Sequence, residues 1–381
     1  MIRINVFGDF RTMDASRLQF GAELQTLLDA GDINLLNFEA PVYAEGTAPI
    51  SKSGPSLSQD KAAPCFLQDR GFNVIGLANN HSLDYGEKAA VATINSFDKA
   101  STIGCGKWNE AYQVKVLEIK GKKIGFLAIT QHEFGVLGDE FYDSDKLGTA
   151  SMSHPRVEEL IVESRDRLDH LFVIPHAGME YCPQPLPRLV TLYRHYINMG
   201  ASGVIGGHPH VPQPWELYRG RPIVYSLGNF CFEKDFQGAN VPEYWYRSLA
   251  ASITVDDESI VMEIHGVDYD PVSHIVNLCD RDVAFTTHMK QLRADFNDKD
   301  QYRAIIDKHA RSMIGSYDYS LSANGFFKYR ASKYFRLLLS HYYRKLPGMQ
   351  QREVDSTHML NDFQCETHRW TICHLLRNKN L

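Results

Sequence analysis

Gly207-His208-Pro209-His210 places two imidazoles one residue apart, directly after a short apolar run at residues 203–206. A third histidine, His176, directly follows the apolar run at residues 171–175. Neutral imidazole nitrogen is the commonest protein ligand of zinc, iron and manganese. Because a strand that ends at a histidine holds the ring rigidly at the rim of a sheet, this stretch predicts a metal site at the ends of strands.

Four earlier places where an apolar run ends carry polar residues that can bind a metal. They are Gly8-Asp9, Asn37-Phe38-Glu39, Asn79-Asn80-His81 and His176-Ala177-Gly178-Met179-Glu180. Packing does not require a polar residue at the end of strand after strand, since buried strands are filled by apolar side chains. The repeated pattern therefore indicates one site to which several strands contribute.

The first two-thirds of the chain alternates short apolar runs with amphipathic segments, which is the pattern of an α/β fold. We expect strands at residues 2–7, 33–37, 74–78, 171–175, 203–206 and 223–226, helices at 86–99, 154–167 and 186–199, and hairpins at 114–129 and 252–265. The strand runs are almost continuously apolar, as expected for strands covered on both faces. We predict an α/β domain over residues 1–275 and a helical C-terminal extension over residues 280–381.

Composition narrows the possible classes of protein. The chain has 381 residues, of which 44% are hydrophobic and 23% charged, and its formal net charge is −6. A broad nucleic-acid-binding surface usually shows as a basic excess, so we expect no nucleic-acid partner. The seven cysteines are scattered and odd in number, which favours a reducing compartment. We find neither a secretory leader nor a membrane-spanning run, so a cytoplasmic protein is expected.

Taken together, the motifs resemble those of two nested families. The wider one is the calcineurin-like metallophosphoesterases, whose five motifs supply Asp, Asp, Asn-His, His and Gly-His-x-His in that order. The narrower one is the CapA family, which is linked to poly-γ-glutamate capsule synthesis and shares that fold. The motifs of this sequence that resemble the CapA family are Gly8-Asp9, Asn37-Phe38-Glu39, the run from Leu77 to Gly86, His176 to Glu180, Gly207 to Gln213 and Tyr225 to Phe230. The resemblance covers residues 1 to about 270. It implies the metallophosphoesterase fold, a mixed β-sandwich flanked by helices.

The resemblance also implies a role for each motif residue and a pair of divalent ions, Mn, Fe or Zn, that activate a water molecule. Two carboxylates, one amide oxygen and three imidazoles would bind the ions: Asp9, Glu39, Asn80, His176, His208 and His210. His81, next to a ligand rather than one itself, would be the general acid or would stabilise the transition state. Asp84 and Glu180 would accept hydrogen bonds that orient histidines.

Two positions depart from the wider family's pattern. That family carries a histidine two residues after its first aspartate, where this chain has Arg11. Arginine does not ligate metals, but it pairs bidentately with phosphate or carboxylate, so we predict a catalytic role for Arg11. One of the two metal sites is then expected to be weak, empty or completed by water. Glu39 stands where the wider family has a bridging aspartate, and its longer side chain would move the bridge.

Several residues also have plain structural interpretations. His208 and His210 are also compatible with an ordinary turn. Asn79 and Asn80 are compatible with a capping role at the start of the helix at 86–99. We prefer this structural role for Asn79 and the ligand role for Asn80. Asp84 is a candidate N-cap of the same helix. Cys365-x-x-His368 with Cys373-His374 resembles a zinc knot, but the spacing is crowded for one tetrahedral site, so core or surface roles are favoured.

The leading functional hypothesis is a metal-dependent hydrolase, a phosphoesterase acting on a small or polymeric anionic substrate in capsule or exopolysaccharide production. One alternative is an amide hydrolase of poly-γ-glutamate. Another is a non-catalytic, metal-stabilised scaffold of a polymer synthesis or export complex. The basic and aromatic stretch at 326–346 suits either a packed helix or a membrane-surface helix. The tail would therefore contact capsule-synthesis proteins or the inner membrane.

Overall fold

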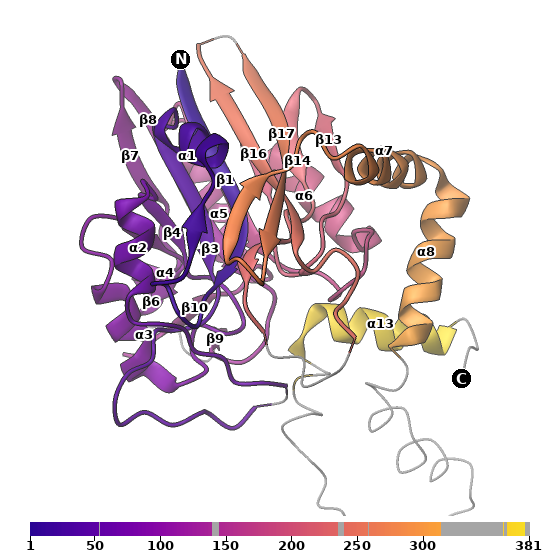
Figure 1. The fold of residues 1–381 in the computed structure, drawn as a ribbon. Helices are drawn as coiled ribbons and strands as arrows, with labels where there is room; N and C mark the ends of the chain where they lie inside the picture. The colour runs from indigo at the N-terminus through magenta and orange to yellow at the C-terminus, as the bar shows by residue number, and fades with distance from the viewer. Residues whose placement is uncertain are drawn as a thin grey trace, which may run out of the picture.

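The computed structural model describes residues 1–52, 54–138, 145–234, 240–257, 259–313, 361 and 364–377. Its centre is a pair of β-sheets (Figure 1). The larger sheet has the strand order β2-β18-β17-β16-β1-β3-β4-β5, with β15 also paired to β1, and the second sheet has the order β13-β14-β12-β11-β8-β7. Strands β6 (Cys105–Gly106), β10 (Gly148–Ala150) and β9 (Val136–Leu137) form a small third sheet.

The strands of the larger sheet are β1 (Ile2–Arg11), β2 (Gln19–Phe20), β3 (Ile33–Phe38), β4 (Val74–Gly76), β5 (Ser101–Ile103), β15 (Asn229–Phe232), β16 (Arg247–Val255), β17 (Ile260–Asp270) and β18 (Ile275–Leu278). Those of the second sheet are β7 (Lys115–Ile119), β8 (Lys122–Thr130), β11 (His170–His176), β12 (Gly203–Ile205), β13 (Trp215–Tyr218) and β14 (Arg221–Val224). The six predicted strands all exist, and both predicted hairpins are confirmed as the antiparallel pairs β7–β8 and β16–β17.

Apolar residues from both sheets fill the space between them. Ile4 and Val6 of β1 belong to the same buried cluster as Phe126 of β8 and Phe172 of β11. The outer face of the larger sheet is covered by α1 (Ala22–Asp29), α2 (Ala63–Asp69) and α3 (Gly86–Asn95). The outer face of the second sheet is covered by α5 (Pro155–Arg165) and α6 (Pro187–Met199). The short helix α4 (Trp108–Ala111) packs beside β6 and β10. The predicted α/β fold, a mixed β-sandwich flanked by helices, is confirmed.

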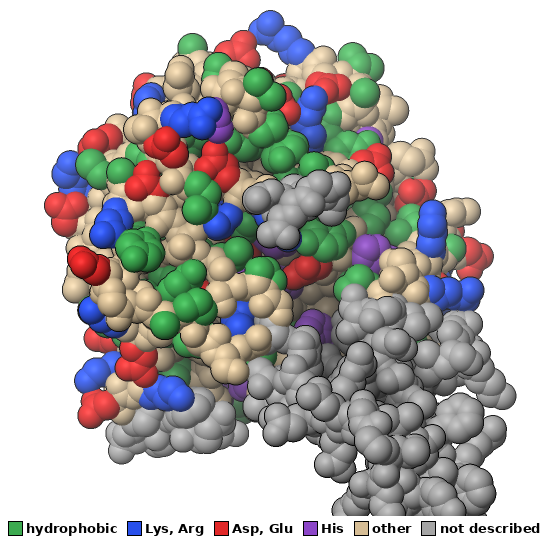
Figure 2. Space-filling view, turned by 60° about the horizontal axis from the view of Figure 1, so that its bottom comes forward, with side chains coloured by type: hydrophobic (Ala, Val, Ile, Leu, Met, Phe, Trp, Pro, Cys, Tyr) green, Lys and Arg blue, Asp and Glu red, His purple; other side chains and the backbone are tan. Residues whose placement is uncertain are grey.

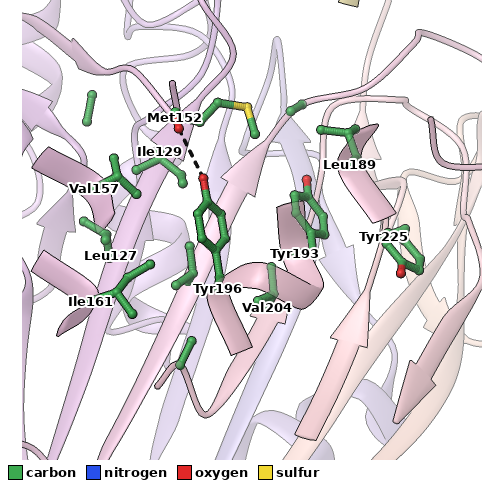
Figure 3. Close-up of a cluster of buried hydrophobic side chains, with 14 of the residues drawn as sticks. Leu127, Ile129, Met152, Val157, Ile161, Leu189, Tyr193, Tyr196, Val204 and Tyr225 are labelled. Carbon is green, nitrogen blue, oxygen red and sulfur yellow. Dashed lines mark hydrogen bonds between the residues drawn. The ribbon is translucent and has the colours of Figure 1, made fainter. Parts of the chain in front are cut away.

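Tyrosines of α6 pack into the cluster outside the second sheet (Figure 3). Tyr193 and Tyr196 are fully buried, and Tyr193 also stacks on Tyr225 with ring centroids 5.7 Å apart. The hydroxyl of Tyr196 donates a hydrogen bond to the backbone carbonyl of Met152 at 3.2 Å. This helix therefore fixes the strand ends that carry the histidines of the second sheet.

The C-terminal part contains three described helices, α7 (Val283–Asn297), α8 (Lys299–Ser312) and α13 (Glu366–Arg377). Asp282 and Asp298 cap α7 and α8, because each side chain accepts hydrogen bonds from the first turn of its helix. A helical tail after residue 280 is thus confirmed for the described residues, whereas the stretch 326–346 lies outside them. The predicted boundary at 275–280 falls between β18 and α7 and stays a prediction. In the described part of the chain, no helix has the length and apolarity needed to cross a membrane. All seven cysteines are free thiols.

Candidate metal centre

The structure brings residues from both sheets together where their strands end. Asp9 lies near the end of β1, and Glu39 directly follows β3. Asn80 follows β4, His176 ends β11, and the two histidines of the opening motif follow β12. All of these side chains are buried. Ligand sites at the carboxyl ends of strands are typical of α/β folds, which is why the strand-end pattern located this region.

The first group of possible ligands is Asp9, Glu39 and His210, whose ligand atoms all lie within 4.8 Å of one another. His210 Nε2 is 3.6 Å from Glu39 Oε1, and its other ring nitrogen, Nδ1, is 2.8 Å from the side-chain oxygen of Asn229. That contact places the ring proton on Nδ1, which leaves the lone pair of Nε2 directed at Glu39. The imidazole is therefore oriented as a metal ligand.

The second group surrounds His176 Nε2. This atom lies 3.1 Å from Asn80 Oδ1, 3.1 Å from His208 Nδ1 and 3.7 Å from Glu39 Oε1. Glu39 Oε1 thus lies within 4 Å of imidazole nitrogens from both groups. Within the described residues, this buried oxygen has no hydrogen-bond partner. A buried carboxylate oxygen without a partner is costly, and a divalent cation is a partner that also suits the neighbouring imidazoles. The donor types of these residues therefore fit divalent metal ions.

The backbone around the centre is tightly constrained. His208 and His210 have positive φ angles of 97° and 60°, which are uncommon for non-glycine residues and are found where the surroundings enforce them. The backbone amide of His208 donates to Asp9 Oδ2 at 3.1 Å. A Cβ on Gly207 would lie 2.9 Å from Asp9 Oδ1, so glycine allows the close approach of these two segments.

Burial sets the protonation of these groups. It raises the pKa of Asp9, and it raises the pKa of Glu39 well above the usual range, with the Asp9 charge adding to the effect on Glu39. Burial lowers the pKa of His176 well below its usual range and that of His208 to about 3. The imidazoles are therefore neutral at neutral pH, which is the form that binds metals.

His81 lies beside the two groups with a different set of partners. Its Nδ1 is 2.6 Å from Asp84 Oδ2, and its Nε2 is 3.9 Å from Glu39 Oε1. Asp84 also accepts hydrogen bonds from the backbone amide of Leu57, at 2.6 Å, and from Lys52. Burial lowers the pKa of His81, and the Lys52 charge adds to that effect. His81 is thus a neutral imidazole with Nε2 facing the centre.

The alternative of a capping role at the next helix is wrong for Asp84. The N-cap of α3 is Tyr85, and no side chain caps that helix. Asn79 does not cap α3 either, but its role is structural. It accepts from the backbone amide of His81 at 3.1 Å and donates to Asn37 Oδ1 at 3.0 Å. Asn79 therefore stabilises the turn that carries Asn80 and His81.

The structure directs the guanidinium group of Arg11 toward backbone groups. Nε donates to the carbonyl of Ser58 at 3.0 Å, Nη1 donates to the carbonyl of Glu233, and Nη2 contacts Met13 Sδ at 2.9 Å. Arg11 is 8% exposed, so these contacts hold the loop around Ser58 against β1. A direct role of Arg11 toward a substrate stays a prediction.

Glu180 lies on the cavity side of the histidines. Burial would raise the pKa of its carboxyl, but His210 and His208 more than offset that effect, so the pKa is lowered. Its backbone carbonyl lies 2.9 Å from Nε2 of His309 in α8.

Four further residues support the centre, and of these the sequence motifs included only Asn37, without a role. Asn37 Nδ2 donates to Asp9 Oδ1 at 2.8 Å, and Lys52 contacts the His81–Asp84 pair as described above. Gln131 lies 2.9 Å from His208 Nε2 through its side-chain amide. Glu133 Oε2 accepts from Asn80 Nδ2 at 3.3 Å, which directs the Asn80 oxygen at His176. Gln131 and Glu133 follow the end of β8, so the pattern of polar residues after a strand could have identified them.

The comparison with known families gives a clear result. Residues 10–234 match the family model described as "Bacterial capsule synthesis protein PGA_cap". The chain belongs to this PGA_cap family.

Two curated proteins are similar to this PGA_cap chain. It is 30% identical over 207 residues to the capsule biosynthesis protein CapA of Bacillus anthracis, a match that covers 52% of this chain and 50% of that protein. It is 30% identical over 220 residues to the PGA biosynthesis protein CapA of Bacillus subtilis (strain 168), covering 55% and 56%. The matches span about half the length of these relatives. The resemblance to the CapA family is thus confirmed.

Among solved structures, a putative 5'-nucleotidase from Staphylococcus aureus in complex with alpha-ketoglutarate has a TM-score of 0.44 and 16% identity to this chain, and covers 78% of this chain and 58% of that one. The 5'-nucleotidase from Candida albicans SC5314 has a TM-score of 0.40 and 10% identity, and covers 82% and 58%.

A cavity of about 260 Å³ opens beside the centre of this PGA_cap chain. It is lined by histidines of the centre, by two lysines, by aromatic side chains and by residues of the tail, among them His81, His208, His210, Lys52, Lys234, Tyr181, Phe232, Trp245, Glu133, Thr367 and His368. Histidine side chains are visible in the hollowed part of this face (Figure 2). A ligand in the cavity would contact His81, His208 and His210, and the neighbouring lysines suit an anionic one.

Proposed function

We propose that this chain is a metal-dependent hydrolase, most simply a phosphoesterase, that acts on a small or polymeric anionic substrate in capsule or exopolysaccharide production of the poly-γ-glutamate type. Membership of the PGA_cap family supports the biological setting. The main observation in support of metal-dependent hydrolysis is the position of Glu39 Oε1. It is buried, has no hydrogen-bond partner among the described residues, and lies 3.6 Å and 3.7 Å from imidazole nitrogens of two separate ligand groups.

Two divalent ions, Mn, Fe or Zn, would be held by the two groups. Asp9, Glu39 and His210 would form one site, and Glu39 with Asn80, His176 and His208 would form the other. When bound, such a pair lowers the pKa of a water molecule and neutralises charge on a phosphoryl group. The first site has one protein ligand fewer than the wider family's pattern because Arg11 replaces a histidine. We therefore propose that this site is the weaker one.

The residues of the chain that would handle protons are His81 and its partners. Asp84 holds His81 Nδ1, so Nε2 is the atom that faces the centre, and in the protonated ring Nε2 would carry the proton given to the leaving group. Lys52 contacts Asp84 and fixes the pair. Glu180, ionised at neutral pH, would help to orient the histidines.

Two cationic side chains of the cavity would face an anionic substrate, beside the carboxylates of Glu133 and Glu180 that also line it. Lys52 and Lys234 line it, and the Lys234 ammonium lies 5.2 Å from the centroid of the Trp245 ring. Aromatic side chains form part of the wall. We propose that capsule-synthesis proteins or the inner-membrane surface contact the tail, that the protein works in the cytoplasm or peripheral to that membrane, and that nucleic acid is not a partner.

Metal analysis combined with turnover tests the proposal. The chain purified without chelator is expected to carry about two equivalents of Mn, Fe or Zn at the centre formed by Asp9 and Glu39, and to hydrolyse a generic phosphodiester or monoester. Glu39→Gln removes the shared carboxylate at constant size and should lose both metal and turnover. Glu118→Gln, an exposed position on β7, is the matched control and should lose neither. At most one equivalent without turnover would contradict the hydrolase and favour a metal-stabilised scaffold.

A second candidate activity is amide hydrolysis of poly-γ-glutamate. The observation that favours it is the family itself, since one relative is described as a PGA biosynthesis protein. The same activated water attacks either electrophile, so the residue roles above would not change. Incubation with poly-γ-glutamate and analysis of chain length separates the two activities. Shortened polymer without phosphoester turnover would replace the first proposal with this one.

A further inference from the structure

A second cluster of possible metal ligands lies outside the centre, where the tail meets the body of the protein. It consists of Glu133, after β8, and Cys365 and His368, at the start of α13. Their ligand atoms all lie within 4.8 Å of one another, and Cys365 Sγ is 3.9 Å from Glu133 Oε1. Around a tetrahedral ion such as Zn²⁺, neighbouring ligand atoms are roughly 3.3–3.5 Å apart, so small side-chain shifts would complete the site.

The neighbouring contacts hold this cluster in place. Three successive tail residues meet three successive loop residues in reverse order. Cys365 contacts Glu133, Glu366 accepts from the backbone amide of His132 at 2.8 Å, and Thr367 Oγ1 donates to Gln131 Oε1 at 2.6 Å. Cys365 and His368 are three residues apart, a spacing that brings side chains to one face of a helix. The ligands therefore come from two segments that already pack against each other.

The cluster adjoins the metal centre, because Glu133 Oε2 accepts from Asn80 Nδ2 at 3.3 Å, but its three residues are not among the proposed ligands of that centre. His208 lies between them, since its Nδ1 faces His176 at 3.1 Å and its Nε2 is 3.9 Å from Glu133 Oε1. Glu133 and His368 line the same cavity as His81. Three protein ligands leave a fourth position of a tetrahedral ion open, and here that position would face the cavity.

We propose that Glu133, Cys365 and His368 form an additional cation site, distinct from the Asp9–Glu39 centre, that takes a thiolate-binding ion such as Zn²⁺ and fixes α13 at the edge of the substrate cavity. A set of sulfur, imidazole and carboxylate ligands selects Zn²⁺ or Co²⁺ over Mg²⁺ or Ca²⁺. Binding of the ion would then determine whether α13 is held in this position. It does not depend on the reaction that the centre performs.

Cobalt titration of the full-length protein tests the proposal, because Co²⁺ bound by a thiolate gives a charge-transfer band in the near ultraviolet. The wild-type chain should develop this band, and Cys365→Ser should lose it. Cys182→Ser changes another fully buried free thiol and should keep the band. Absence of the band in the wild type, or its survival in Cys365→Ser, would overturn the site.

Two further variants test the site even if Cys365→Ser does not fold. Glu133→Gln and His368→Ala keep the thiol and should weaken cobalt binding, followed by the same band, at least about tenfold. Unchanged cobalt affinity in both would also overturn the proposal. Asp9→Asn perturbs only the centre and should keep the band, so a failure of the proposed hydrolase and a failure of this site give different results.

Discussion

The imidazole of His81 differs from those of His176 and His208 in what its nitrogens face. His176 Nε2 and His208 Nδ1 lie 3.1 Å apart, and among the described residues no carboxylate lies at hydrogen-bond distance from either nitrogen. His81 Nδ1 instead has Asp84 at 2.6 Å. We expect His81→Ala to reduce hydrolysis by about 10²–10⁴-fold, the usual contribution of a general acid, and to leave the metal content nearly unchanged. Elemental analysis and initial rates measure both quantities.

The comparison variant is His208→Ala, which should lose metal as well as activity. The two variants remove the same imidazole group from one buried site. If both lose metal to the same extent, His81 is a ligand and its proposed role in proton transfer is wrong.

Lys52 is expected to set the pH range of the reaction. Burial and then the Lys52 charge lower the pKa of His81, so its protonated form is lost at a lower pH than in an ordinary histidine. Lys52→Met removes the cation, and the pKa of His81 should rise. Because a general acid acts in its protonated form, the basic limb of the pH–rate profile then moves to higher pH. Rates measured across this range give the shift.

Lys234→Met is the matched control for this prediction. It removes a cation from the same cavity, one whose ammonium lies over the ring of Trp245. Its basic limb should coincide with that of the wild type. An unshifted limb in Lys52→Met would mean that Lys52 acts only as a structural partner of Asp84.

Strand β1 carries the first ligand to the centre, and the glycine before that ligand decides how close β1 comes to its neighbour. A Cβ on Gly8 would lie 1.8 Å from the backbone carbonyl of Gly228, and Asp9 N donates to that same carbonyl at 2.9 Å. Gly8→Ala must therefore push the two segments apart. We expect a loss of roughly 1–3 kcal/mol or more in the free energy of unfolding and a lower metal affinity. Denaturant unfolding and metal titration measure these effects.

Gly76 in β4 provides a control within the same sheet. A Cβ there would have its nearest contact at 3.4 Å, so Gly76→Ala should change stability little. Equal stability of the Gly8 and Gly76 variants would contradict the close-contact explanation.

The sequence predicted the elements better than it predicted the contacts between them. Apolar runs located the six strands, and because parallel strands end at one edge of a sheet, the residues after β1, β3 and β4 could be expected to meet one another, as could those after β11 and β12. The meeting of these two sets across the two sheets depends on how the sheets pack. Lys52 and Glu133 lie in loops, and nothing in the local sequence says that Lys52 folds back onto Asp84. Cys365 and His368 reach Glu133 only because α13 returns to the body after more than 200 residues. Such contacts depend on tertiary packing, which periodicity does not encode.

At the scale of the whole molecule, the tail helices complete the hydrophobic core. Phe285, Met289 and Leu292 of α7 belong to the cluster between the two sheets. Ile306 of α8 and Leu375 of α13 belong to the cluster that contains Tyr193 and Tyr196. The described part of the tail therefore covers apolar surface of the sandwich in addition to contributing residues to the cavity.

A chain that ends at Asp280 tests whether residues 1–275 fold as a domain of their own. It lacks the three buried α7 side chains, each worth about 1.5–3 kcal/mol on burial. Their sum, roughly 5–9 kcal/mol, is comparable to the whole stability of a typical domain. We expect this chain to aggregate or to unfold at a much lower temperature than the full-length protein, as measured by calorimetry. A soluble product with an unchanged unfolding temperature would support an independent domain and contradict the packing argument.

The matched chain for this experiment ends at Met313, because it keeps α7 and α8 and removes only the residues after them. It should keep most of the stability of the full-length protein, since it loses only the side chains of the last segment from the core. For that reason it is the better chain for testing the proposed contact of the tail with a membrane surface. Co-sedimentation with anionic vesicles should fall relative to the full-length protein if the residues after 313 bind the surface, and equal co-sedimentation of the two chains would exclude these residues as the membrane contact.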